Sequence, residues 1–258
     1  MKILKFGGSS VANSENIKKV IQIISESLEK DKDLIVVVSA LGGVTNNLIK
    51  IASFASEQNG AYKKLSEAFI KQHNEAIKKL IKSKNLKSVL SEVERKYDEL
   101  SESLRGIYLL GELSFRSLDK IMSFGEQLSA YIISEAIKAQ EINCKFVDSR
   151  ILIKTDDSFG SANVNIKKTY ALLSSHFQSS PGLSIMGGFI ASTDDGVTTT
   201  LGRGGSDYTA SLVGAAVDAK VVEIWTDVDG VMTADPRKVD DAFPLIKITY
   251  EEAGELAH

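Results

Sequence analysis

A lysine and two glycines stand together near the beginning of the chain, in the segment KFGGSS that starts at Lys5. The apolar residues before it predict a strand that ends here, and paired glycines let backbone N–H groups approach an anion closely. Lys5 adds a point charge at the same place. The pattern fits a phosphate-binding turn, and a plain strand-to-helix turn with a solvated lysine explains it equally well.

A second glycine-rich segment, LGRGGSDYT from Leu201, places three glycines around Arg203 and predicts a helix that opens at Ser206 or Asp207. A helix N-terminus favours negative charge, and an arginine binds a carboxylate or phosphate through two parallel hydrogen bonds. Ser206 as N-cap and Asp207 as a first-turn residue also have purely structural roles. Arg203 has little capping to do, so we interpret it as an anion-binding residue.

The common nucleotide-binding fingerprints do not occur in the sequence. It contains no G-x-x-x-x-G-K-[ST], and no G-x-G-x-x-G that opens a helix. These absences argue against P-loop enzymes, protein kinases and Rossmann dehydrogenases.

Composition narrows the class of protein. The chain has 258 residues, of which 43% are hydrophobic and 25% charged, as in a soluble globular protein. A net charge of -3 gives no attraction to nucleic acid or acidic lipid, so no nucleic-acid partner is expected. Cys144 is the single cysteine, which favours a reducing cytoplasm, and the longest aliphatic run, 34–38, is too short to span a membrane.

The chemistry-bearing turns must be positioned by strands and helices. Continuous apolar runs predict strands at 1–5, 34–38, 183–190 and 221–226, and helical spacing predicts helices over 17–28 and 210–217. Their alternation predicts an α/β protein with a central, mainly parallel sheet between helices. Because ligands bind beyond the carboxyl ends of such strands, we expect the glycine-rich turns to meet in one crevice.

Two further segments interrupt this alternation. From 62 to 122 the pattern changes to long helices, which we interpret as a helical excursion, with His73 as a surface or packing residue on it. Asp194-Asp195-Gly196 predicts a hairpin turn. We expect one domain, 1–258, with a first lobe of about 1–195 for substrate and a second of about 196–258 for nucleotide.

Five segments together closely resemble the aspartate kinases of the amino-acid kinase family. They are KFGGSS from Lys5, SALGGVTN from Ser39, SFGE from Ser123, TTTLGRGGSDYT from Thr198 and WTDVDGVMTADPR from Trp225. The resemblance implies the amino-acid kinase fold and transfer of the γ-phosphoryl group of ATP to the side-chain carboxylate of L-aspartate. The product, 4-phospho-L-aspartate, leads to lysine, threonine, methionine and isoleucine.

The resemblance also implies the roles of individual residues. Lys5 would neutralise charge on the transferring phosphoryl group, and Asp207 would orient Lys5. Arg203 would bind the α-carboxylate of aspartate and Glu126 its ammonium group. The remaining substrate contacts would come from Ser39, Thr45 and Ser206, and the phosphate and nucleotide contacts from Gly7, Gly8, Ser9, Thr226, Asp227, Met232 and Arg237. Mg²⁺ would be held mainly by ATP, so no metal-ligating residue is named.

Several alternatives stay open from the sequence. Ser123-x-x-Glu126 is also a capping box, which local sequence favours for Glu126. A sister kinase acting on glutamate, acetylglutamate, carbamate or UMP would share the glycine turn, and a nucleotide-binding scaffold without turnover is the alternative from another class.

The last residues also carry an expectation. Thr249 to Glu252 predicts a capped helix, and the chain stops at His258. In the family, the continuation supplies a further nucleotide-binding lysine and regulatory ACT domains. We therefore expect a truncated catalytic domain of low activity alone, from a homo-oligomeric protein that is either monofunctional or fused to homoserine dehydrogenase.

Overall fold

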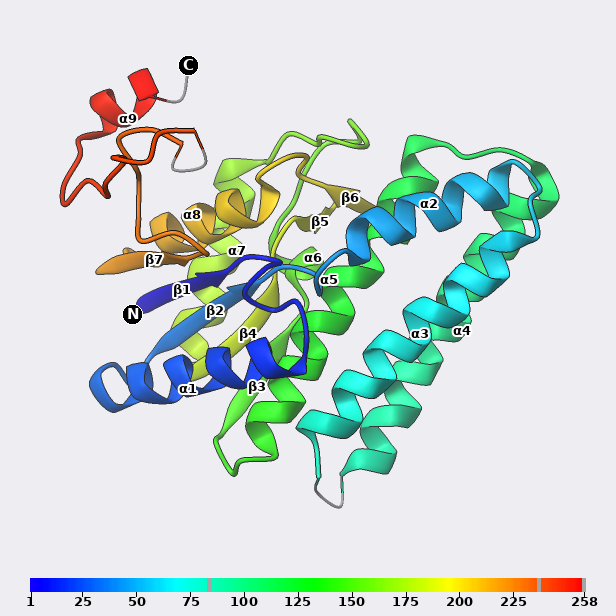
Figure 1. Cartoon of the computed structure of the whole chain (residues 1–258), viewed down its shortest axis with the longest axis horizontal. Coiled ribbons are helices and arrows are strands. Elements are labelled where there is room, and N and C mark those ends of the chain that lie inside the picture. The colour runs from blue at the N-terminus through cyan, green and yellow to red at the C-terminus, as the bar shows by residue number, and fades with distance from the viewer. Residues whose placement is uncertain (83–84, 236–237, 257–258) are drawn as a thin grey trace. The chain divides into compact units, whose positions relative to one another are not determined.

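The central sheet of the computed structural model is parallel throughout. The structure describes residues 1–82, 85–235 and 238–256, and in them this sheet has five strands in the order β3-β4-β2-β1-β7. The strands are β1 (Lys2–Phe6), β2 (Leu34–Val38), β3 (Cys144–Val147), β4 (Leu183–Gly187) and β7 (Val221–Trp225). The expected mainly parallel sheet with flanking helices is confirmed (Figure 1).

Strand β2 shows why the sheet needs two layers of helices. Each of its five residues is buried, because they alternate between the two faces of the sheet. Val36 and Val38 belong to the apolar cluster on one face, and Ile35 and Val37 to the cluster on the other. An unbroken β-branched run therefore takes a place at the centre of the sheet.

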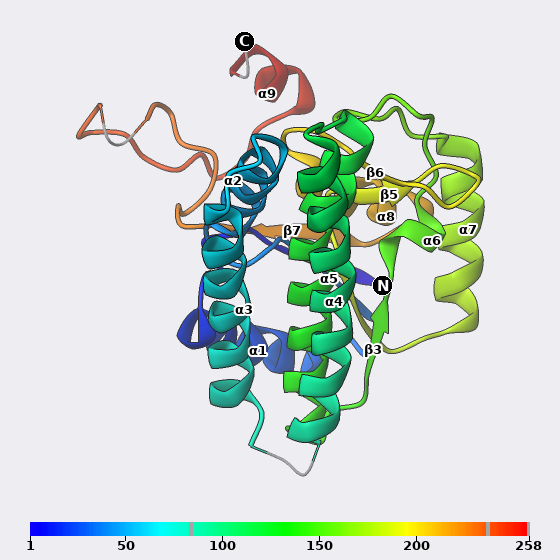
Figure 2. The same ribbon diagram turned by 90° about the vertical axis from the view of Figure 1, so that its right-hand side faces the viewer.

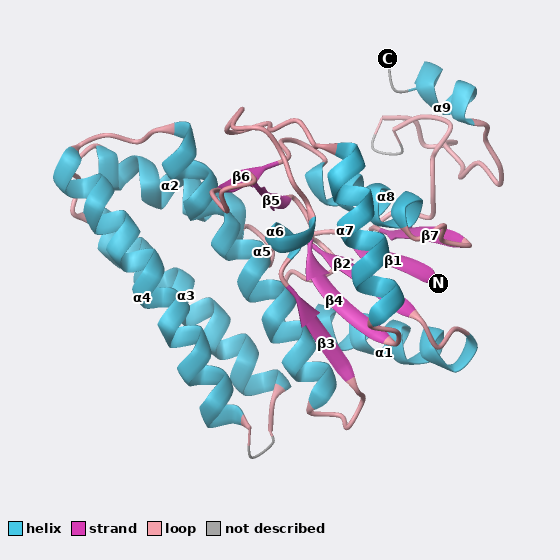
Figure 3. Cartoon of the chain, turned by 180° about the vertical axis from the view of Figure 1, so that it is seen from behind, coloured by secondary structure: helices cyan, strands magenta, loops and turns pink. Residues whose placement is uncertain are grey.

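One face is covered by α1 (Ser14–Lys30) and α5 (Phe115–Lys138). Helix α1 begins at Asn13, whose side chain accepts hydrogen bonds from the N–H groups of Glu15 and Asn16, and it buries an apolar stripe that includes Ile17 and Ile24. The other face is covered by α6 (Ser149–Leu152), α7 (Ile166–Ser179) and α8 (Gly205–Ala216), which are clearest from behind (Figure 3).

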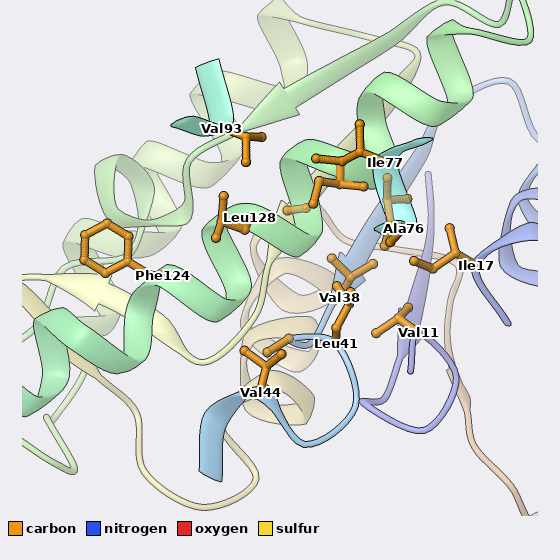
Figure 4. Close-up of a cluster of buried hydrophobic side chains, with 14 of the residues drawn as sticks. Val11, Ile17, Val38, Leu41, Val44, Ala76, Ile77, Val93, Phe124 and Leu128 are labelled. Carbon is orange, nitrogen blue, oxygen red and sulfur yellow. The ribbon is translucent and has the colours of Figure 1, made fainter. Parts of the chain in front are cut away.

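The helical excursion consists of α3 (Ala61–Leu80) and α4 (Leu86–Leu110), which lie against α2 (Val44–Ser56) and α5 (Figure 2). The excursion ends with α4 at Leu110 and not at residue 122, as the sequence predicted. Residues 115–122 are instead the first part of α5, which runs on to Lys138 and buries a continuous stripe against the sheet. Figure 4 shows that Ile77 of α3, Leu128 of α5 and Val38 of β2 share one core. His73 is buried in this helical layer, which confirms packing rather than surface exposure.

The glycine pair Gly187-Gly188 divides the strand expected at 183–190. Strand β4 ends at Gly187, Phe189 adopts a positive φ of 67°, and β5 (Ile190–Ser192) then pairs antiparallel with β6 (Thr198–Thr200). The expectation of one strand is therefore wrong, because the chain turns between the two halves. The hairpin turn at Asp194-Asp195-Gly196 is confirmed.

The chain forms two compact units, Met1–Trp225 and Thr226–His258. This division lies beyond the expected lobe boundary near residue 195, because β6, α8 and β7 pack with the first unit. The second unit contains α9 (Tyr250–Leu256), where the Thr249 and Glu252 side chains cap each other's N–H groups as expected. Among the described helices, none combines the length and the apolar character needed to cross a membrane.

Candidate active site

Three neighbouring strands of the sheet end together and form the floor of the candidate site. Backbone hydrogen bonds continue past the strand ends, from Ser39 N to Phe6 O at 3.1 Å and from Gly188 N to Val38 O at 2.8 Å. The turns that follow β1, β2 and β4 are therefore held side by side at the carboxyl edge of the sheet. This is where an open parallel sheet binds ligands.

Lys5 and Asp207 form an ion pair at this edge. Lys5 is the fourth residue of β1 and is 8% exposed, and its Nζ lies 2.7 Å from Asp207 Oδ1 in the first turn of α8. A Cβ built on Gly7 would lie 3.6 Å from the same Nζ, so the ammonium group stands beside the glycine turn. The structure contains an ion pair through which Asp207 could orient Lys5 as the resemblance implies, and it holds a cation close to the backbone of Gly7; the roles of both residues stay predictions.

Ser39 and Ser206 join the ends of β2 and α8. Their hydroxyl groups are hydrogen-bonded at 3.1 Å. Ser206 is not the N-cap that the sequence suggested, because Gly204 takes that place with a φ of 73° and α8 begins at Gly205. The hydroxyl of Ser206 is therefore not needed as a cap, and it faces Ser39 at the site.

Glu126 lies in the middle of α5, and its capping role is wrong. The helix begins eleven residues earlier, at Phe115, and its N-cap is Ser114, whose side chain accepts a hydrogen bond from Ser117 N. Glu126 is 3% exposed, and its Oε1 accepts a hydrogen bond from Ala40 N at 3.3 Å.

The other carboxylate oxygen of Glu126, Oε2, has no hydrogen-bond partner among the described residues. Burial raises the pKa of Glu126 to about 8. A buried acceptor without a donor is costly in the free protein, and a ligand ammonium group would supply that donor.

The side chains of Arg203 and Thr45, two further expected site residues, have no partner among the described residues. Arg203 is exposed on the segment between β6 and α8, between Gly202 and Gly204, which both have positive φ. Thr45 is half-buried in the first turn of α2. In the part of the chain that the structure describes, neither side chain forms a hydrogen bond or an ion pair, so the structure does not join them to Lys5 or Glu126.

The glycine turn after β1 contains Gly7, Gly8 and Ser9. A Cβ on Gly8 would lie 3.5 Å from Ala40 O, so the turn runs close to the end of β2. Ser9 is exposed and its carbonyl accepts a hydrogen bond from the Asn16 side chain at 2.8 Å. The turn is thus tied to α1 through Ser9, whose side chain is exposed.

The expected nucleotide residues lie in the second unit. The Thr226 hydroxyl donates to Asp227 Oδ1 at 3.0 Å, and half-buried Met232 forms a β-bridge with Pro244. Arg237 lies outside the described residues. These roles stay predictions.

Within the described ranges, no three His, Cys, Asp or Glu side chains are placed to hold a metal ion.

The sequence did not identify Gly188 as a site residue. A Cβ on Gly188 would lie 2.7 Å from both Cα and Cβ of Ser206, so only glycine lets β4 end against α8 at this distance. The signal was present, since Gly187-Gly188 interrupts an apolar run as Gly7-Gly8 does after β1.

The sequence is similar to curated aspartokinases along nearly its whole length. Bifunctional aspartokinase/homoserine dehydrogenase 2, chloroplastic, of Arabidopsis thaliana is 35% identical over 98% of this chain. Lysine-sensitive aspartokinase 3 of Escherichia coli is 34% identical over 99% of this chain. The chain spans 28% of the first relative and 55% of the second.

Solved structures of aspartate kinases also match the fold of this chain. The crystal structure of E. coli aspartokinase III in complex with aspartate and ADP matches this whole chain and 56% of its own, with a TM-score of 0.88 and 31% identity. Clostridium acetobutylicum aspartate kinase matches the whole chain and 55% of its own, with a TM-score of 0.78 and 26% identity. The amino-acid kinase fold is confirmed by these matches. Since residues 1–258 also match the family's sequence pattern, the chain belongs to the amino acid kinase family.

Proposed function

We propose that this chain is the catalytic domain of an aspartate kinase, which transfers the γ-phosphoryl group of ATP to the side-chain carboxylate of L-aspartate. One observation carries the proposal. The ion pair of buried Lys5 with half-exposed Asp207, beside a glycine turn suited to phosphate, shares the carboxyl edge of the sheet with Glu126 and its unpartnered oxygen. The similarity to a structure solved with aspartate and ADP supports it.

The amino-acid end of the substrate is bound by opposite charges. Glu126 Oε2 accepts hydrogen bonds from the α-ammonium group, and Arg203 binds the α-carboxylate through parallel hydrogen bonds. Because Arg203 is unpaired in the described residues, it is free to bind an anion without breaking an existing ion pair. Hydroxyl groups from Ser39, Thr45 and Ser206 donate to the substrate's carboxylates.

The phosphate end is bound by Lys5 and by the backbone N–H groups of Gly7, Gly8 and Ser9. Asp207 holds the ammonium group of Lys5 in place at 2.7 Å, and about half of the Asp207 side chain remains exposed. A fixed cation stabilises charge on the transferring group without reorganising during the reaction. The nucleotide is contacted by Thr226, Asp227, Met232 and Arg237.

No general base is needed in this reaction. The substrate carboxylate has a reference pKa of about 3.9, so it is already an ionised nucleophile at neutral pH. The task of the protein is to bring two anions together and to offset their repulsion. Mg²⁺ bound with ATP would neutralise phosphate charge and would be held mainly by ATP rather than by residues of this chain. The homo-oligomeric state and the cytoplasmic location stay part of the proposal.

Hydroxylamine trapping tests the function. The intact protein is incubated with ATP, Mg²⁺ and either aspartate or glutamate, and an acyl phosphate is captured as a hydroxamate. We expect a hydroxamate with aspartate and none with glutamate. Lys5→Ala should lower the rate of hydroxamate formation about 100-fold or more. Product with glutamate would instead indicate a sister kinase. Nucleotide binding without any hydroxamate would indicate a scaffold and contradict the proposal.

A further inference from the structure

Asp119 is a buried carboxylate of α5 to which the reaction described above gives no role. It is 0% exposed. Its Oδ2 accepts hydrogen bonds from Gly160 N and Thr200 N, both at 3.0 Å, and its Oδ1 accepts one from the Thr200 hydroxyl at 2.7 Å. A single side chain therefore satisfies three donors, which come from two separate segments of the chain.

Both segments lie beside or within the stretch of chain that directly precedes Arg203. Thr200 ends β6 and stands three residues before Arg203. The carbonyl of Thr200 accepts a hydrogen bond from Ala162 N at 2.9 Å, and a Cβ on Gly202 would lie 2.8 Å from Ser161 Oγ. The segments 160–162 and 200–202 are thus packed together, and Asp119 ties them to α5.

Helix α5 also carries Glu126, seven residues after Asp119. Seven residues are close to two helical turns, so both carboxylates project from the same side of the helix, about 10 Å apart along its axis. A helix is a rigid spacer over two turns. The position of the Arg203 segment is therefore set with respect to Glu126 through one element.

We propose that Asp119 is a positioning residue that fixes the Arg203 segment relative to Glu126. It keeps at one separation the two charges that bind the α-carboxylate and the α-ammonium group of the amino-acid substrate. The inference rests on the proposed function. Asp119 acts through Arg203 and touches neither substrate, so its loss changes recognition of the amino acid and spares recognition of ATP.

Steady-state kinetics of the intact protein test this role. Asp119→Ala should raise the KM for aspartate about 10-fold or more and leave the KM for ATP within about twofold. Asp119→Asn should stay within about threefold of the wild type, because its amide oxygen still accepts from the two N–H groups and its NH₂ group donates to the Thr200 hydroxyl. Ile132→Ala removes a buried side chain from the same helix and is the control for a purely structural loss.

The outcomes separate this role from simple destabilisation. A less stable enzyme has a smaller active fraction, which lowers the apparent kcat with both KM values unchanged, as expected for Ile132→Ala. An unchanged aspartate KM in Asp119→Ala, or an equal rise of both KM values, would overturn the inference. If Asp119→Ala does not fold, Thr200→Val removes only the hydroxyl bond. It should raise the aspartate KM about threefold, and no rise would overturn the inference.

A double-mutant cycle with Arg203→Ala tests whether Asp119 acts through Arg203. In the Arg203→Ala background, Asp119→Ala should raise the aspartate KM no further, whereas an additional 10-fold rise would overturn the inference. Wild-type protein in the same assay keeps this result distinct from the proposed function. If the wild type forms no hydroxamate with aspartate, the function itself fails, whatever the variants do.

Discussion

Gly188 and Ser206 approach each other so closely that a Cβ on Gly188 would lie 2.7 Å from Cα and Cβ of Ser206. Real Cβ atoms do not reach such distances, so any side chain at residue 188 pushes the end of β4 away from α8. The next residue of α8 is Asp207, the ion-pair partner of Lys5. The contact therefore sets the position of α8 at the site.

Gly188→Ala should lower both stability and activity. Overpacking against backbone costs about 1–3 kcal/mol of unfolding free energy, and the shift of Ser206 and Asp207 should reduce kcat/KM about 10-fold or more. Gly106→Ala is the control, because nothing lies within 4 Å of its Cβ in α4. It should stabilise the protein by about 0.5–1 kcal/mol with unchanged kinetics. Urea unfolding and initial rates measure both effects, and a fully active Gly188→Ala would contradict the argument.

The Lys5–Asp207 pair has a matched counterpart on the same strand. Lys2 Nζ lies 2.7 Å from Glu223 Oε1 at the opposite end of β1. Asp207→Asn should lower kcat about 10-fold or more, because Lys5 loses the charge that holds its ammonium group toward the glycine turn. Lys2→Ala breaks an ion pair of the same length and should leave kcat within twofold. Equal effects of the two variants on kcat would show that Asp207 has no special role.

Glu126 should make aspartate recognition depend on pH. Its pKa of about 8, raised by burial, means that the carboxyl group is mostly neutral at pH 7 in the free protein. Only the ionised form attracts the substrate ammonium group strongly, so the KM for aspartate should fall as pH rises from about 6.5 to 8.5. Glu126→Gln should raise this KM sharply and abolish its dependence on pH in that range. A wild-type KM that is constant over this range would contradict the role of Glu126.

The same group affects stability. The folded-state pKa of Glu126 is raised above the unfolded value, so the unfolded chain loses a proton first as pH increases. The unfolding free energy should therefore decrease between about pH 4.5 and 8, by an amount on the order of 5 kcal/mol. Glu126→Gln should lack this contribution. Urea unfolding of both proteins across the range measures the difference, and identical slopes would contradict the buried, unpaired state of Glu126.

The sequence allowed much of the fold and part of the site to be predicted, and the misses have physical causes. An uninterrupted apolar run such as Leu34–Val38 is stable only as a strand buried on both faces, so the central parallel sheet could be predicted from such runs. Ser123-x-x-Glu126 misled because a capping box is a local pattern, whereas the start of α5 is set by Ser114. Asp119 had no local signal at all. Its three hydrogen-bond donors come from residues 41 and 81 positions away, and only the tertiary structure brings them together.

His73 should make the protein less stable in acid. It is a buried residue of α3, its Nδ1–H donates to Phe69 O at 2.9 Å, and its Nε2 has no partner among the described residues. Burial lowers its pKa from 6.5 to about 4. As pH falls below 6.5, His73 is therefore protonated in the unfolded chain while it stays neutral in the folded protein. The unfolding free energy should then decrease between pH 6.5 and 4, by an amount on the order of 3 kcal/mol. His73→Phe, which keeps an aromatic ring beside Phe69, should lose this dependence, and urea unfolding at pH 7 and pH 4.5 compares the two proteins. The same loss of stability in both would show that other groups cause it.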